Sequence, residues 1–433
     1  RGLAYTEFIS IGADFSSYEA IVDKIYWTGF PDVFSPNFIT YCRKMAQERC
    51  PAYKEDKWLF GYFLDNELEW FGKTGSITGL AEETIKRPAS SYAKKALVQL
   101  LKKQYKSISS FNTAWGTNFR SWEDALASTN WAEKSSAKAF ADKTVFVRLC
   151  ADKYFSISTA AIRAADPNHM ILGCRFAGNA PDIVDIAGKY CDIVSINFYG
   201  MVDLDKLTAP GLYETMLGYY KKAKRPLMVT EWSFPALDAG LPSTAGAGMR
   251  VRTQADKAKA FEVYQTLFFA MPFFVGSDYF MWVDEPALGI AKTFPENSNY
   301  GLVDVNDDPW PVFTTKVSKV NKKVYDMHSG KVSDIGIVNV NATKNVKVNI
   351  KNSGTLNCQT SVILSIDGKT YSRPVSLDAG KKVEVDFDCN LNPGGHYITV
   401  SIDQDSLLNE INRGNNYYSG FIYTKGYSMH SKG

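Results

Sequence analysis

Features that mark several common classes of function are scarce or missing in this sequence. The chain has 433 residues but only four histidines, at positions 169, 328, 396 and 430, which are too scattered to form a ligand set. Its seven cysteines include no C-x-x-C pair. We therefore expect no metal and no cofactor.

The net charge of the chain is also small, and long apolar runs are missing. The chain carries 49 Lys and Arg against 46 Asp and Glu, a formal net charge of +3, which leaves no electrostatic footprint for nucleic acid. No stretch approaches the about 18 apolar residues of a membrane span, and the first residues lack the pattern of a signal peptide. We expect neither a nucleic-acid partner nor a membrane span.

Two catalytic motifs are missing as well. No G-x-S-x-G is present, so a serine hydrolase with a nucleophile elbow is not indicated. No Gly-rich phosphate loop follows the first predicted strand, which argues against a doubly wound nucleotide-binding sheet. Cys358 and Cys389 fall on strands that look paired, and the sequence leaves open whether they form a disulfide.

What the chain does contain is enough apolar sequence for more than one domain, since 45% of its residues are hydrophobic. Up to about residue 330, apolar runs alternate with amphipathic helical patterns, which predicts a parallel sheet covered by helices. The runs are residues 4–12, 58–65, 170–176, 191–199, 226–232 and 275–283, and the clearest helical patterns are 36–50, 91–105, 143–166 and 253–271.

From residue 332 onward the pattern changes to short alternating strands separated by turns such as Asp367-Gly368 and Pro393-Gly394-Gly395. This pattern predicts an antiparallel sandwich of immunoglobulin type. We therefore expect a helix-covered sheet domain over residues 1–331 and a β-sandwich accessory domain over residues 332–433.

Two glutamates stand out because each comes at the end of a predicted buried strand: Glu67 after "FGYFLDN" and Glu231 after "PLMVT". In a (β/α)8 barrel these strand ends form the active-site face. Retaining glycosidases need two carboxyl groups about 5 Å apart, one as nucleophile and one as acid and then base. One such Glu alone is more simply an ion-pair partner, but two flanked by aromatics favour catalysis.

The order of these residues resembles clan A glycoside hydrolases. The resemblance implies a TIM barrel in which Asn66 and Glu67, the acid/base, end strand four, and the nucleophile Glu231 ends strand seven. It also implies that Tyr199 lies near the nucleophile and that Trp282 ends strand eight. If the strand before Glu67 is strand four, three strands should come before it, but only residues 4–12 form a convincing one. We therefore expect this chain to lack the first two barrel strands, as an N-terminally incomplete piece; a degenerate barrel is the alternative.

The remaining candidate residues are assigned to substrate binding. Asn66 is placed to contact a sugar 2-hydroxyl or to cap a strand end, and Tyr199 to hold Glu231 or to satisfy a buried amide. Aromatic faces suit the C–H side of a pyranose, although most Trp residues are core. The candidates are the aromatics Trp70, Trp232 and Trp282 and the polar residues Arg175, Asn197 and Asp284.

Within the clan, "GYFLDNELEWFG" and "NYGLVDVNDDPWP" look most like the β-agarase and β-galactosidase-like branch. This resemblance implies hydrolysis of a galactose-containing polysaccharide or oligosaccharide by double displacement. The alternative is a catalytically silent carbohydrate-binding or cell-surface structural protein on the same scaffold.

The segment "SIDQDSLLNEINRGNNYYSGFIY" resembles CARDB-type domains. Its Asp, Asn and Glu side chains are expected to tie a β-turn, with a calcium or sugar site as the alternative. Such domains accompany extracellular enzymes, so the resemblance implies an extracellular or cell-surface location and an accessory domain whose candidate contacts are polysaccharide and the cell surface.

Overall fold

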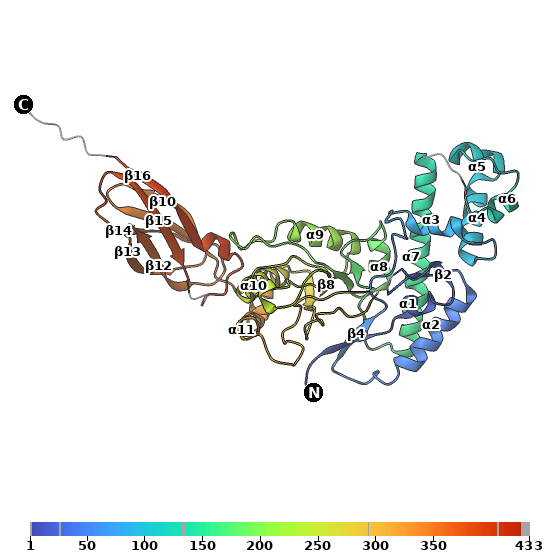
Figure 1. Cartoon of the computed structure of the whole chain (residues 1–433), viewed down its shortest axis with the longest axis horizontal. Helices are drawn as coiled ribbons and strands as arrows, with labels where there is room; N and C mark the ends of the chain where they lie inside the picture. The colour runs from blue at the N-terminus through green and yellow to red at the C-terminus, as the bar shows by residue number, and fades with distance from the viewer. Residues whose placement is uncertain (1, 26, 132–135, 293, 405–406, 426–433) are drawn as a thin grey trace, which may run out of the picture.

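The fold is taken from a computed structural model, which describes residues 2–25, 27–131, 136–292, 294–404 and 407–425. A β-sandwich lies at one end of an elongated molecule, and helices α4 (Tyr92–Tyr105), α5 (Ile108–Trp115) and α6 (Trp122–Ala127) lie at the other (Figure 1). Between them lie the parallel strands and the helices that cover them.

The six predicted apolar runs all contain strands, and all of these strands pair in parallel. One sheet has the order β1-β4-β5 and the other β6-β7-β8-β9. Because β5 and β6 are two parts of residues 170–177, this segment joins the sheets into one succession with β1 and β9 at the outer edges. The strands are β1 (Tyr5–Phe8), β4 (Leu59–Phe63), β5 (Met170–Ile171), β6 (Phe176–Ala177), β7 (Val194–Asn197), β8 (Leu227–Glu231) and β9 (Phe274–Ser277).

Helices lie between the strands as predicted, and side-chain caps fix where several of them begin. Ser35, Ser91 and Thr253 each accept a hydrogen bond from a backbone N–H of the first turn. The other helices are α1 (Ile11–Phe15), α2 (Pro36–Arg49), α3 (Gly79–Lys86), α7 (Ala137–Ala165), α8 (Val184–Tyr190), α9 (Leu212–Ala223), α10 (Gln254–Ala270), α11 (Pro311–Asn321) and α12 (Val324–His328), with a 3-10 turn η1 (Leu237–Ala239).

The segment between β1 and β4 contains more structure than the sequence predicted. The helix expected over residues 36–50 is present as α2. A short antiparallel hairpin, β2 (Ala20–Val22) with β3 (Phe30–Pro31), precedes it and was not predicted. This hairpin brings Thr28 next to the motif after β4, where its hydroxyl donates to the Glu67 carbonyl at 2.6 Å.

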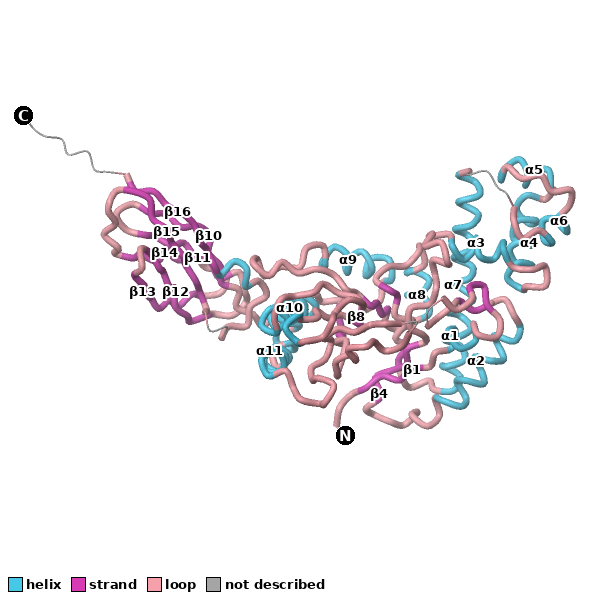
Figure 2. Tube along the Cα trace, viewed as in Figure 1, coloured by secondary structure: helices cyan, strands magenta, loops and turns pink. Residues whose placement is uncertain are grey.

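The C-terminal region is all β, as predicted. Two antiparallel sheets, β10-β11-β14 and β13-β12-β15-β16, enclose their own apolar core, which includes Val362, Leu364 and Val400 (Figure 2). Cys358 and Cys389 both carry free thiols. The strands are β10 (Ile335–Ala342), β11 (Val346–Asn352), β12 (Cys358–Ile366), β13 (Lys369–Leu377), β14 (Lys382–Phe387), β15 (Gly394–Ile402) and β16 (Tyr417–Thr424).

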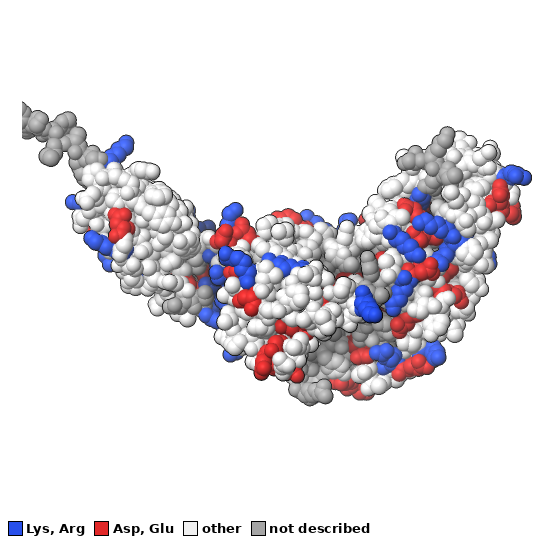
Figure 3. All heavy atoms as spheres, viewed as in Figure 1, with Lys and Arg blue, Asp and Glu red and all other residues white. Residues whose placement is uncertain are grey.

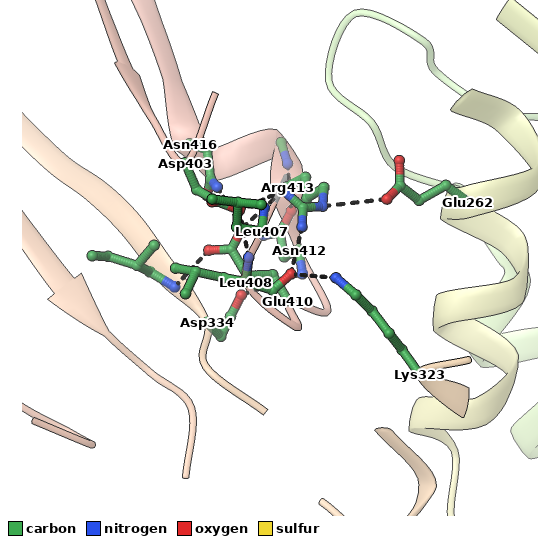
Figure 4. Close-up of polar contacts among 12 residues, drawn as sticks. Glu262, Lys323, Asp334, Asp403, Leu407, Leu408, Glu410, Asn412, Arg413 and Asn416 are labelled. Atoms are coloured by element: carbon green, nitrogen blue, oxygen red, sulfur yellow. Dashed lines mark hydrogen bonds and ion pairs between the residues drawn. The ribbon is translucent and has the colours of Figure 1, made fainter. Parts of the chain in front are cut away.

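Arg413, in the 3-10 turn η2 (Arg413–Asn416), joins the sandwich to the helices (Figure 4). Its guanidinium lies 2.9 Å from Asp403, 3.2 Å from Glu410 and 3.5 Å from Glu262 of α10. Asp403 also accepts hydrogen bonds from the backbone of Leu407 and Leu408. The acidic and amide side chains of this segment therefore tie the turn, as the sequence indicated.

Acidic and basic side chains are interspersed over the face seen in Figure 3, without one large area of a single sign. Among the described residues, no helix is both long and apolar enough to cross a bilayer.

Candidate active site

The segment Asp65-Asn66-Glu67 leaves the C-terminal end of β4 and turns sharply. The Asp65 carboxylate is fully buried and accepts hydrogen bonds from the backbone of Gly12 and Ala13, at 2.7 and 2.8 Å, and from the Tyr154 hydroxyl at 2.6 Å. Glu67 has a φ of 51°, a left-handed conformation that a non-glycine residue adopts only when its surroundings hold it. Asp65 thus anchors the segment in the core, while Glu67 lines a cavity.

Glu67 is held by Asn197 at the end of β7, which lies beyond the β5–β6 segment from β4. The Asn197 amide nitrogen donates to Glu67 Oε1 and to Asn66 Oδ1, both at 2.9 Å. Asn197 is itself fixed because its Oδ1 accepts from the Thr230 hydroxyl at 2.9 Å. Burial raises the pKa of Glu67, and the Asn197 hydrogen bond only partly opposes that shift. A raised pKa together with a neutral amide as hydrogen-bond donor suits a group that must carry a proton.

Glu231 ends β8 and has two donors of a different kind. Arg175 donates to Glu231 Oε1 at 2.7 Å, and the Tyr199 hydroxyl donates to Oε2 at 2.9 Å, as the sequence suggested for Tyr199. Burial raises the pKa of Glu231 to about 7, while Arg175 opposes the shift and the nearby Glu67 adds to it. Both donors favour the ionised form, which suits a nucleophile.

Glu67 and Glu231 line one cavity of about 250 Å³, together with Asn66 and Tyr199. Its wall includes residues that the sequence analysis did not single out: the acid Glu296 and the apolar side chains Trp27, Ala247, Phe280, Ile290 and Phe294. Trp27 and Phe294 meet edge to face, with ring centroids 4.6 Å apart. The cavity thus combines carboxyl groups with aromatic rings, as a sugar site requires.

Several residues predicted to bind substrate lie elsewhere. Trp70 and Trp232 are buried in the core, 2% and 1% exposed, where neighbouring rings cover them, so neither can offer a free face to a sugar. Asp284 is also buried, and its carboxylate accepts from Asn299, the backbone of Gly301 and the Trp310 indole. These three assignments to the substrate site are therefore wrong: the residues hold the fold.

The other predicted residues divide between the cavity and its surroundings. Asn66 and Tyr199 line the cavity, whereas Arg175 and Asn197 touch its two glutamates. Trp282 is 66% exposed outside the cavity. Within the described ranges, no group of three or more His, Cys, Asp or Glu side chains could hold a metal ion. What the cavity offers is acid–base and nucleophilic chemistry by two carboxyl groups.

Comparison with known families agrees with this geometry. Residues 31–238 match the family model described as Beta-galactosidase, and residues 331–420 match CARDB. Beta-agarase B of Vibrio sp. (strain JT0107) is 30% identical over 311 residues, which cover 69% of this chain and 31% of that protein. The chain belongs to the β-agarase and β-galactosidase-like branch of the clan A glycoside hydrolases.

Further members of this branch match with similar extent. Beta-agarase A of the same Vibrio strain is 28% identical over 371 residues, or 83% of this chain and 35% of that protein. A solved exo-beta-agarase is 30% identical with a TM-score of 0.62, and covers 70% of this chain and 40% of its own. The agarase AgWH50C has the same identity and TM-score, with 75% and 45% covered. This clan A chain spans about a third of its curated relatives.

Proposed function

We propose that this chain carries the active site of a retaining β-glycoside hydrolase that cleaves a galactose-containing polysaccharide or oligosaccharide. The observation that carries the proposal is the pair Glu67 and Glu231, which end two parallel strands and line one cavity. Each has donors of its own: a neutral amide for Glu67, and a guanidinium and a phenol for Glu231. That difference supports different roles for the two groups.

In the proposed reaction, Glu231 attacks the anomeric carbon while Glu67 gives its proton to the leaving glycosidic oxygen. The bond to the leaving sugar breaks and a glycosyl ester on Glu231 forms. Glu67, now ionised, takes a proton from water, and the water oxygen attacks the same carbon and releases Glu231. Two displacements leave the anomeric configuration unchanged.

The remaining cavity residues fit substrate binding. Asn66, fixed by Asn197, is placed to contact the 2-hydroxyl, an interaction that strengthens in the transition state. Trp27 and Phe294 supply ring faces and edges for the apolar side of a sugar. Glu296 would accept hydroxyl hydrogen bonds, and the exposed Trp282 would stack a sugar unit outside the cavity.

Fold and location follow from the same proposal. With β5 and β6 counted as one strand, the parallel strands correspond to strands three to eight of a (β/α)8 barrel, with Glu67 after the fourth and Glu231 after the seventh. The division between barrel and sandwich is placed at residue 331, and the separate core of the sandwich supports it. The CARDB match supports an extracellular or cell-surface location.

Hydrolysis of an aryl β-galactoside and of agarose tests the proposal, using the protein and its Glu231→Ala variant. We expect the variant to lose activity by about 10⁴-fold or more, because the covalent step is removed. The first product, followed by NMR, should keep the β-configuration. No turnover by either protein would overturn the proposal in favour of a silent carbohydrate-binding protein, and equal turnover by both would overturn the role of Glu231 as nucleophile. An inverted product would overturn the double displacement.

A second experiment separates the two roles. Glu67→Ala should still cleave aryl glycosides whose leaving group needs no proton, but should lose agarose cleavage. Added azide should restore turnover to both variants, with a β-glycosyl azide from Glu67→Ala and an α-glycosyl azide from Glu231→Ala, since azide attacks opposite faces of the sugar. The same azide anomer from both variants would contradict the assignment.

A further inference from the structure

The two outer faces of the C-terminal sandwich differ in charge. In sheet β13-β12-β15-β16 successive side chains point to opposite faces. One face, which packs on the core or lies at the sheet rim, is made of the even-numbered residues of β12, β15 and β16 and the odd-numbered residues of β13. The opposite set forms the outer face: odd-numbered residues of β12, β15 and β16, and even-numbered residues of β13. None of these outward residues is charged, and most are Ser, Thr or aromatic.

The outer face of the other sheet is charged in the ordinary way. Lys347 forms ion pairs with Glu384 and Asp386 across neighbouring strands. The absence of charge is therefore particular to the β13-β12-β15-β16 face. Since 22% of the residues in this chain are charged, an outer sheet face without a single charged side chain is unusual and points to a specific role.

Large aromatic rings stand on this uncharged face. Tyr397, Tyr417, Phe421 and Tyr423 are 51%, 56%, 68% and 78% exposed. Tyr397 lies opposite Phe421 on the next strand, with ring centroids 5.2 Å apart. The Tyr423 ring lies over Gly395, where even a Cβ atom would come within 3.1 Å of it. Cross-strand packing therefore supports these rings and leaves one side of them to solvent.

Three of these rings, Tyr417, Phe421 and Tyr423, lie on a strand at the edge of the sheet, where proteins normally prevent association with another strand. β16 is an edge strand of its sheet, and edge strands usually carry charges or prolines that discourage association. β16 has neither along Tyr417–Thr424. At the end nearest the barrel, Tyr417 lines a cavity of about 310 Å³ that it shares with α10 residues such as Glu262. The aromatic row thus runs from the far end of the sandwich to the barrel.

We propose that this aromatic face binds an uncharged polysaccharide chain. Ring faces stack on the C–H side of pyranoses, and Ser and Thr hydroxyls exchange hydrogen bonds with sugar hydroxyls. An uncharged face suits an uncharged partner, since neither side has to strip water from an ion. The choice of agarose as the probe rests on the proposed function, whereas the binding chemistry does not.

Retention on agarose tests the proposal with the full chain. Glu231→Gln serves as the parent protein, because it leaves the matrix intact. We expect affinity electrophoresis through agarose to slow this protein, and Phe421→Ala combined with Tyr423→Ala to weaken the retention by about tenfold. Tyr325→Ala, which removes an exposed ring of α12 (86% exposed), is the matched control and should change nothing.

Conservative variants keep the test decisive if the alanine variant fails to fold, which thermal unfolding followed by circular dichroism would reveal. Phe421→Tyr and Tyr423→Phe preserve the ring faces and should keep full retention, whereas Tyr423→Ser alone should weaken it. Retention of the parent by a sulfated galactan should be weaker than by agarose, since nothing on the face neutralises sulfate.

Four results would overturn the inference: no retention of the parent, equal retention of parent and Tyr423→Ser, equal or stronger binding of the sulfated galactan, or concentration-dependent dimerisation that the ring variants abolish. The last would mean that the face pairs two copies of this chain. If the wild-type protein is retained by agarose but cleaves neither agarose nor an aryl galactoside, the proposed function fails and this inference stands.

Discussion

At the scale of single residues, Arg175 makes the clearest prediction, because it lies 2.7 Å from the Glu231 carboxylate and opposes the effect of burial on the Glu231 pKa. Arg175→Met removes that positive charge. The pKa of Glu231 should then rise above about 7, so that ionisation requires a higher pH and the acidic limb of the kcat/KM profile moves to higher pH.

The control for Arg175 is Arg148→Met, which removes an ion pair with Asp185 on a helix and should leave the profile unchanged. Tyr199→Phe should shift the limb in the same direction as Arg175→Met but by less, because a neutral donor is lost. A limb that stays in place or moves to lower pH would contradict the role of Arg175.

A second prediction concerns Trp27, which lines the cavity although no pattern in the sequence marks it. Trp27→Ala removes a ring against which a sugar can pack. We expect KM for agaro-oligosaccharides to rise about fivefold, since ring contacts are worth about 1 kcal/mol, with a smaller change in kcat. Trp58→Ala is the matched control, because Trp58 is 39% exposed against 40% for Trp27 but lies outside the cavity. Equal KM changes in both would refute the assignment.

The predicted site residues that lie at or beside the cavity differ in one respect from those that are buried in the core. Glu67, Asn197 and Glu231 sit at strand ends, where parallel pairing alone brings side chains to one edge. Trp70 lies only three positions beyond Glu67, yet its ring turns into the core. Proximity in sequence to a catalytic motif therefore says little about aromatics, because loop geometry decides where they point.

At the scale of secondary-structure elements, apolar runs and helical periodicity were sufficient to locate the parallel strands and the main helices. They could not reveal that residues 170–177 divide into two short strands, each pairing with a different neighbour. Nor could they place Trp27 beside Phe294 in the cavity wall. Contacts of this kind join loops that are distant in sequence and follow no period.

Two glycines in helices give a matched prediction at this scale. A Cβ atom on Gly188 in α8 would lie 1.9 Å from the Ala223 carbonyl oxygen at the end of α9, whereas one on Gly218 in α9 would meet nothing within 4 Å. Gly188→Ala should lower the free energy of unfolding by about 1–3 kcal/mol, since the backbones must separate. Gly218→Ala should raise it by about 0.5–1 kcal/mol. Urea titrations measure both, and changes of equal sign would contradict the packing of α8 on α9.

At the scale of the whole molecule, one side chain serves both the sandwich and its attachment. Arg413 neutralises Asp403 and Glu410, which are 6% and 2% exposed, and it also reaches Glu262 on the barrel side (Figure 4). A second link runs from the Lys323 ammonium group to the Leu408 carbonyl at 2.9 Å. Stability of the sandwich and its docking are therefore separable by substitution.

Arg413→Met and Glu262→Gln should separate the stability of the sandwich from its docking on the barrel side. Arg413→Met leaves two buried carboxylates without their cation, which should destabilise the sandwich by about 3–5 kcal/mol and lower its transition in calorimetry. Glu262→Gln removes the cross-domain partner and the ion pair that Glu262 makes with Lys316 of α11. Arg413 keeps Asp403 and Glu410, so the sandwich transition should move by less than about 1 kcal/mol. Both variants should broaden the distance distribution from small-angle X-ray scattering, because both lose the link to α10. An equal drop of the sandwich transition in both variants would show that Glu262, rather than Asp403 and Glu410, sets the stability of the sandwich. Unchanged scattering in both variants would mean that Lys323 and the remaining contacts suffice for docking.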